Sequence, residues 1–239
     1  MAGNVTAGKR NEGAWPGGGT GKSMRVLIVA DEEAKALWDY YDPARVEGVE
    51  LILSCGDLNS RYLEFLVTMV NCPLLYVHGN HDNRYDRQPP EGCIDIEDRI
   101  VSYKGLRILG LGGSMRYKEG PHMYTEGQMY RRVLTAGMKS TFTNGFDILL
   151  THAPARGWRD MEDLPHRGFE CFNQLLDRWK PAYMLHGHVH QTYSYQFQRE
   201  TVHSSGTRII NGFGYHILDI PEEIYSGGRR GFFSKADRI

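Results

Sequence analysis

The sequence lacks the features that mark membrane, secreted and nucleic-acid-coating proteins. No apolar run approaches the roughly 20 residues of a membrane-spanning helix, and the first residues lack the apolar core of a secretory signal peptide. Neither sign of charge dominates, because 28 Lys and Arg residues stand against 29 Asp and Glu residues. We therefore expect a cytoplasmic protein with no membrane partner and no extensive nucleic-acid surface, whose ligand is recognised by a local site. The oligomeric state stays open.

Cysteine is also scarce and widely spaced. The four cysteines form no Cys-x-x-Cys pair, which argues against a zinc knuckle or a disulfide framework; they are Cys55, Cys72, Cys93 and Cys171. Partly buried, reduced thiols are the simpler interpretation. With 239 residues, 41% of them hydrophobic, the chain is long enough for one sizeable α/β domain.

The pattern of apolar runs predicts a layered α/β fold. Residues 1–23 are expected to form a flexible, Gly-rich leader whose Gly17-to-Ser23 end resembles a phosphate-binding loop but has Pro16 where that loop needs glycine. We expect one domain over residues 24–220. A C-terminal extension over residues 221–239 comes after it and is expected to be loosely ordered at 235–239. The expected strands span residues 24–30, 49–54, 74–77, 100–103, 106–111, 146–150 and 182–185, then antiparallel runs at 192–197, 208–211 and 215–220. The expected helices span residues 34–41, 62–70, 125–139 and 169–179.

Polar side chains follow five of these apolar strands directly. The clearest case is a run from Leu74 to Val77 that stops near a glycine and presents Asn80, His81 and Asp82 in succession. Ligands of open α/β sheets usually bind at the carboxyl ends of strands. The candidate ligands collected from these strand ends are Asp31, Glu33, Asp57, Asn80, His152, His188 and His190.

Each candidate alone has a plainer interpretation, since an Asp after a strand is commonly a turn or cap residue and a single His is commonly structural. Together, carboxylates and imidazoles suit divalent Mn, Fe, Zn or Ni, and seven such groups exceed what one ion needs. The set therefore predicts two metal ions. The bend at Gly187 lets His188 and His190 diverge towards adjacent ions, while Gly56 and Gly79 allow close backbone approach.

In these motifs the sequence resembles the calcineurin-like metallophosphoesterase superfamily. That family carries Asp-x-His, Gly-Asp, Gly-Asn-His-Asp or Glu, a lone His, and Gly-His-x-His, in that order. Here the matching segments begin at Asp31, Gly56, Gly79, His152 and Gly187, and the resemblance covers residues 24–220. It implies an α-β-β-α sandwich with mixed sheets.

The resemblance also implies the chemistry of a metal-dependent phosphoesterase. Metal one would be held by Asp31, Glu33, Asp57 and His190, and metal two by Asp57, Asn80, His152 and His188. Manganese is the expected ion, with iron, zinc or nickel as alternatives. A hydroxide bridging the two ions would attack the phosphorus of a small phosphomonoester or phosphodiester. His81 would protonate the leaving oxygen or stabilise the transition state, supported by Asp82.

The sequence departs from the family at Glu33, where the family usually has histidine. Glutamate can ligate a metal through oxygen, so we expect two-metal binding to be retained; the alternative is that Glu33 points elsewhere and metal one is held less tightly. Two other functions stay open. One is a nuclease of the same superfamily, and the other is a non-catalytic scaffold that binds metal or phosphate with a degraded site.

Overall fold

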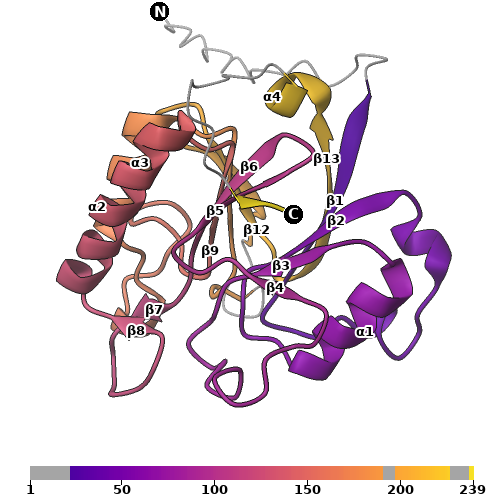
Figure 1. Ribbon diagram of the computed structural model, residues 1–239. Coiled ribbons are helices and arrows are strands. Elements are labelled where there is room, and N and C mark those ends of the chain that lie inside the picture. Colours follow the sequence, from indigo (N-terminus) through magenta and orange to yellow (C-terminus); the bar gives the residue numbers. More distant parts are fainter. Residues whose placement is uncertain (1–21, 191–196, 227–236) are drawn as a thin grey trace, which may run out of the picture.

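The first of two facing sheets carries the amino-terminal half of the fold. The computed structural model describes residues 22–190, 197–226 and 237–239 (Figure 1). The first sheet has the strand order β13-β1-β2-β3-β4, in which β1 to β4 are parallel and β13 runs antiparallel to β1. Its strands are β1 (Ser23–Ala30), β2 (Val49–Ser54), β3 (Leu74–Tyr76), β4 (Ile94–Asp95) and β13 (Gly214–Pro221).

The second sheet is longer and mixed. Its order is β11-β12-β10-β9-β6-β5-β14, with β12, β10, β9 and β6 parallel and the hairpin partner β5 antiparallel to β6. The strands are β5 (Ile100–Tyr103), β6 (Leu106–Leu111), β9 (Ile148–Thr151), β10 (Tyr183–His186), β11 (Glu200–Val202), β12 (Arg208–Asn211) and β14 (Asp237–Arg238). A small parallel pair, β7 (Ser114–Met115) and β8 (Met123–Tyr124), lies apart from both sheets.

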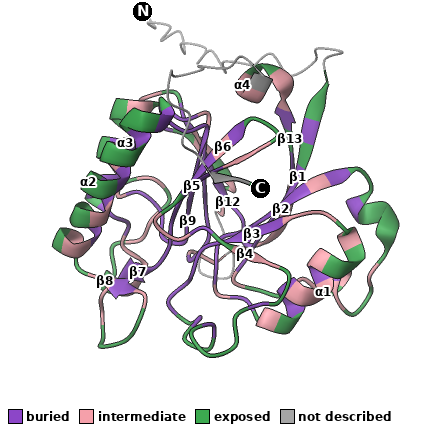
Figure 2. Ribbon diagram, viewed as in Figure 1, coloured by how far each residue is buried: buried purple, intermediate pink, exposed green. Residues whose placement is uncertain are grey.

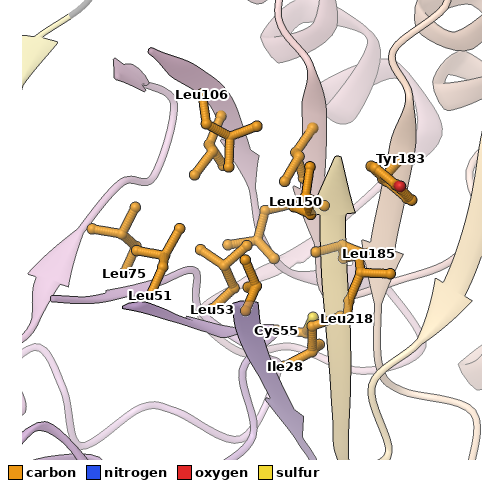
Figure 3. Close-up of a cluster of buried hydrophobic side chains, with 14 of the residues drawn as sticks. Ile28, Leu51, Leu53, Cys55, Leu75, Leu106, Leu150, Tyr183, Leu185 and Leu218 are labelled. Atoms are coloured by element: carbon orange, nitrogen blue, oxygen red, sulfur yellow. The ribbon is translucent and has the colours of Figure 1, made fainter. Parts of the chain in front are cut away.

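The central core lies between the two sheets. Figure 3 shows Leu51, Leu53 and Leu75 of the first sheet in one cluster with Leu150 and Leu185 of the second, and all five are fully buried. These strands have apolar residues on both faces because each sheet is also covered by helices on its outer side. Burying each such leucine contributes about 1.5–3 kcal/mol relative to leaving it exposed.

Helices cover the outer face of each sheet. Helix α1 (Ser60–Val70) packs Tyr62, Leu63 and Leu66 on the first sheet. Helices α2 (Glu126–Thr143) and α3 (Glu170–Trp179) pack on the second, and Figures 1 and 2 show them on the opposite side of the molecule from α1. The short elements are η1 (Lys35–Leu37), η2 (Pro43–Val46), η3 (Leu164–His166) and α4 (Glu222–Ser226). The predicted α-β-β-α architecture with mixed sheets is confirmed.

Several predicted elements differ in detail. The helix expected at residues 34–41 is only the 3₁₀ turn η1, because Ala34 supplies no capping side chain and the chain turns again at Pro43. Strand β12 pairs parallel to β10 and antiparallel only to β11. The C-terminal end, expected to be loose, contributes β14, which pairs with β5.

Two of the expected segments fall largely outside the part of the chain that the structure describes. They are the leader, of which residues 1–21 lie outside the described residues, and the run predicted at 192–197, of which residues 192–196 do. Among the described helices, none is both long and apolar enough to cross a membrane.

Candidate metal centre

The strand ends that carry the candidate ligands meet at one edge of the two sheets. Backbone hydrogen bonds join the loops there: the amide of Asp31 donates to the carbonyl of Gly56, and the amide of Gly187 donates to that of His152. The amide of Gly113, after β6, donates to the carbonyl of His78, after β3, at 2.7 Å. The edge is therefore a single network that connects both sheets.

Three of the predicted ligands form a compact group with little exposure to solvent. Asp57, His152 and His188 each offer a ligand atom, and these atoms all lie within 4.8 Å of one another. The Nε2 atom of His152 lies 3.1 Å from Oδ1 of Asn80 and 3.4 Å from Oδ2 of Asp57. The Nδ1 atom of His152 lies 2.8 Å from the carbonyl oxygen of Cys55, so the ring is oriented with Nε2 towards the other ligands.

Electrostatics within this group favour a cation. Burial of His152 alone would lower its pKa, but the charge and hydrogen bond of Asp57, the charge of Asp31 and the carbonyl of Cys55 together outweigh burial and raise the pKa to about 9. Burial of Asp57 would raise its pKa, yet His152 and the amide of His81 hold that pKa well below its usual range. Burial, reinforced by the charge on His152, lowers the pKa of His188 to about 3. A proton on His152 therefore balances the charge of Asp57, and a divalent ion with oxygen and nitrogen ligands would take the place of that proton.

The second set of predicted ligands lies beside the first. The carboxylate of Asp31 accepts the backbone amide of His188 at 2.9 and 3.0 Å, and its Oδ1 lies 3.6 Å from Nε2 of His190. The Asp31 side chain is fully buried, whereas that of His190 is 31% exposed. A Cβ at Gly187 would collide with this carboxylate, so the close approach of the two loops requires glycine there.

Glu33 lies beside the beginning of α1. Its side chain is exposed, and Oε1 accepts the backbone amide of Asn59 at 2.9 Å. Asn59 is the N-cap of α1 and lies two residues after Asp57. The carboxylate is therefore near the loop that carries Asp57 but is hydrogen-bonded to that loop's backbone, and ligation by Glu33 stays a prediction.

The two predicted catalytic residues differ in exposure. His81 is exposed, and its amide donates to Oδ1 of Asp57 at 2.7 Å. Asp82 is buried, and its Oδ2 accepts the amides of Gly79 at 2.7 Å and Asp57 at 2.8 Å. Burial and the charge of Asp57 raise the pKa of Asp82 to about 6. The Asp82 carboxylate therefore connects the loop after β2 with the loop after β3. The roles of His81 and Asp82 in catalysis stay predictions.

The two loop glycines predicted to allow close approach are needed for contact between the loops. A Cβ at Gly56 would collide with the backbone of Gly79, and a Cβ at Gly79 would collide with the carboxylate of Asp57. Gly56 also has φ +92°, in the region that favours glycine.

A partly buried carboxylate that the sequence did not single out also supports this edge. Glu97 accepts the amide of His78 at 3.2 Å and that of Gly112 at 2.7 Å, and it pairs with the guanidinium of Arg132. Burial alone would raise the pKa of Glu97, but hydrogen bonding to His78 and the charge of Arg132 lower it to about 2. Glu97 follows a strand of only two residues, so no apolar run in the sequence pointed to it.

The loop after β9 closes the other side of the group. Its Pro165 carbonyl oxygen lies 2.6 Å from Nε2 of His188, which leaves Nδ1 of that ring as the nitrogen available to a metal. The neighbouring His166 places Nδ1 2.6 Å from Oδ2 of Asp163, and its ring lies 5.3 Å from that of His188. The ring of His122, from the loop after β7, stacks on His78 at 4.3 Å.

Comparisons with known proteins agree with this fold. Residues 24–192 match the family model described as calcineurin-like phosphoesterase. An uncharacterized protein of Haemophilus influenzae is 24% identical over an alignment of 181 positions, with coverage of 63% of this chain and 76% of that protein. Two solved structures share the fold at TM-scores of 0.61 and 0.56; each is 14% identical, with coverage of 83% of this chain and 95% of its own. The second is TT1561 of Thermus thermophilus.

Proposed function

Because the chain belongs to the calcineurin-like phosphoesterase family, we propose that it is a metal-dependent hydrolase of small phosphomonoesters or phosphodiesters. The proposal depends on one observation: Asp57, His152 and His188 come from three different strand ends, and one ligand atom of each lies within 4.8 Å of the other two. The near balance of charge, with a formal net charge of −1, supports a small substrate over a long nucleic acid.

The proposed cofactor is a pair of divalent ions, with manganese the first choice for mixed oxygen and nitrogen donors. One ion would be held by Asp57, Asn80, His152 and His188, and the other by Asp31, Glu33, Asp57 and His190. When bound, such a pair would supply an activated water as the nucleophile and would neutralise charge on the phosphoryl oxygens.

The other proposed roles belong to side chains of the protein itself. Asp57 would contribute its charge to both ions, since its two carboxylate oxygens already face different partners, His152 and the amide of His81. His81, exposed beside this carboxylate, would donate a proton to the departing oxygen. Asp82 would keep the loop that carries His81 in place through the amides of Gly79 and Asp57.

The test is hydrolysis of an aryl phosphate and of the corresponding aryl diester by purified protein. The protein is first stripped with chelator and then assayed with and without Mn²⁺. We expect turnover that requires the metal and is lost again on chelation. Bound metal without turnover on either ester would contradict the proposal and favour a non-catalytic scaffold.

A further inference from the structure

Helix α2 carries a row of large apolar side chains on its outer face. Tyr130 is 39% exposed, Leu134 50%, Met138 62% and Phe142 62%. They recur every fourth residue, so they form one continuous ridge along the helix. We call these four residues the α2 ridge. The opposite face of α2, with Met129 and Val133, packs in the core, so the ridge is additional to the residues that attach the helix to its sheet.

The neighbouring helix shows that this ridge is not a requirement of the fold. Helix α3 covers the same sheet and buries Phe172, Leu175 and Leu176. Its exposed positions are polar and include Gln174, Asp177 and Arg178. Two helices with the same structural task therefore expose different surfaces, and the apolar surface of α2 needs an explanation outside the core.

We propose that the α2 ridge is the interface through which two copies of this chain associate. Four such side chains at these exposures present on the order of 400–500 Å² of apolar surface, since a single aromatic side chain carries about 150–250 Å². A patch of this size is on the scale of the largest apolar patch of a typical monomer, and such patches are often functional. Together with the flanking Arg131, Thr135 and Thr141 they approach the roughly 800 Å² per partner of a stable interface.

The spacing of the ridge fits a two-fold axis. In an antiparallel pair of α2 helices centred near Ala136, Tyr130 lies opposite the second copy's Phe142, and Leu134 lies opposite its Met138. Each large side chain then meets another, as an isologous interface requires. A Cβ at Gly137, near the centre, would meet no heavy atom within 4 Å, so the helix surface is low where the two axes would cross.

The charge on this face has one sign. No acidic residue lies between Glu126 and Asp147 in the sequence, and Arg131 and Lys139 are exposed, so contact between the apolar side chains must outweigh some like-charge repulsion. In the antiparallel arrangement Arg131 lies opposite Thr141 of the second copy, so the pairing places no like charge directly against it.

The experiment is sedimentation equilibrium of the full chain from about 1 μM to about 200 μM, a range that brackets micromolar dissociation constants. We expect the average mass to rise from one chain towards two. The double substitution Leu134→Gln and Met138→Gln keeps the charge and should weaken association by at least about tenfold, which is about 1.4 kcal/mol. Met69→Gln, at an exposed methionine on α1, is the matched control and should leave association unchanged.

Circular dichroism and the melting temperature check that each variant is folded, and the two single substitutions replace the double one if it is not. A wild-type chain that stays monomeric over the whole range overturns the proposal. So does a dimer that survives substitution of the ridge, or one that Met69→Gln weakens equally. Binding of the monomer to vesicles of anionic lipid, without self-association, would also overturn it and assign the ridge to a membrane surface.

Discussion

The two halves of the candidate metal centre differ in how firmly contacts within the protein hold the ligand side chains in place. Asn80, His152 and His188, which we call the inner half, are buried, and each has its orientation set by a protein partner. Asp31, Glu33 and His190, the outer half, include an exposed carboxylate at Glu33 that is hydrogen-bonded to Asn59. Pre-oriented ligands bind a metal with less loss of conformational freedom. We therefore expect the inner half to bind its ion more tightly.

Asp57 lies between the two halves, so its removal should have the largest effect. Asp57→Asn keeps the shape of the side chain but removes the charge, and we expect both ions to be lost together with turnover. The loss in affinity should exceed about 100-fold, because even partners of ligands contribute about 10–100-fold. Isothermal titration with Mn²⁺ measures it, with the exposed Asp177→Asn as control. Retention of one tight ion would mean that Asp57 serves only one half.

Substitution of His81 tests whether turnover can be lost while both halves still bind their ions. His81→Ala should leave the number of bound ions unchanged and reduce turnover by about 10²- to 10⁴-fold, the range typical of a general acid. The pH dependence of the rate should lose one of its limbs at the same time. Metal content by elemental analysis and rates with the aryl ester provide the two measurements. Wild-type turnover in this variant would remove the role assigned to His81.

The inner half also makes a prediction about protons. Because the pKa of His152 is raised from its ordinary value of 6.5 to about 9, the metal-free site holds a proton near neutral pH. A metal must displace that proton, so the affinity of the inner half should rise about tenfold per pH unit up to about pH 9. Titrations in buffers of different ionisation enthalpy count the protons released. Affinity that is independent of pH would mean that the proton is absent.

The same shift affects the stability of the metal-free chain. A group whose pKa is raised on folding stabilises the protein fully below its unfolded pKa, and loses that contribution as the pH rises through the folded value. For His152 this window extends from about 6.5 to about 9. The melting temperature of chelated protein should therefore fall over this range, and His152→Gln should remove that part of the decrease.

The proximity of Asp57 and Asn80 could be predicted because each follows an apolar strand. The runs before them form the neighbouring parallel strands β2 and β3 of one sheet, whose carboxyl ends meet at one edge. The meeting of these residues with His152, which follows β9 of the second sheet, depends on how the two sheets pack. The glycines at 56 and 79 followed from the need for close approach.

The sequence could not reveal contacts that depend on the relative position of the two sheets. Glu97 and Arg132 lie 35 positions apart and meet only because α2 packs on the second sheet near the loop before β5. The carbonyl of Pro165 reaches His188 through a loop without a repeating pattern. The helix predicted at residues 34–41 was too long, because eight residues are too few to establish a helical period, and only the turn η1 forms there.

Glu33 should give the smallest effect and the most direct test of the difference between the halves. Its Oε1 already accepts the amide of Asn59, which is 2.9 Å away, so that oxygen has less electron density to offer an ion than a free carboxylate oxygen. The outer ion is then the weaker one, so Glu33→Gln should reduce only the weaker of two Mn²⁺ affinities, by about tenfold, and Glu33→His should increase it. The adjacent Glu32→Gln is the matched control, because Glu32 is also exposed. If Glu33→Gln leaves both affinities unchanged, Glu33 serves only to hold the beginning of α1, and the outer ion is held by Asp31, Asp57 and His190 alone.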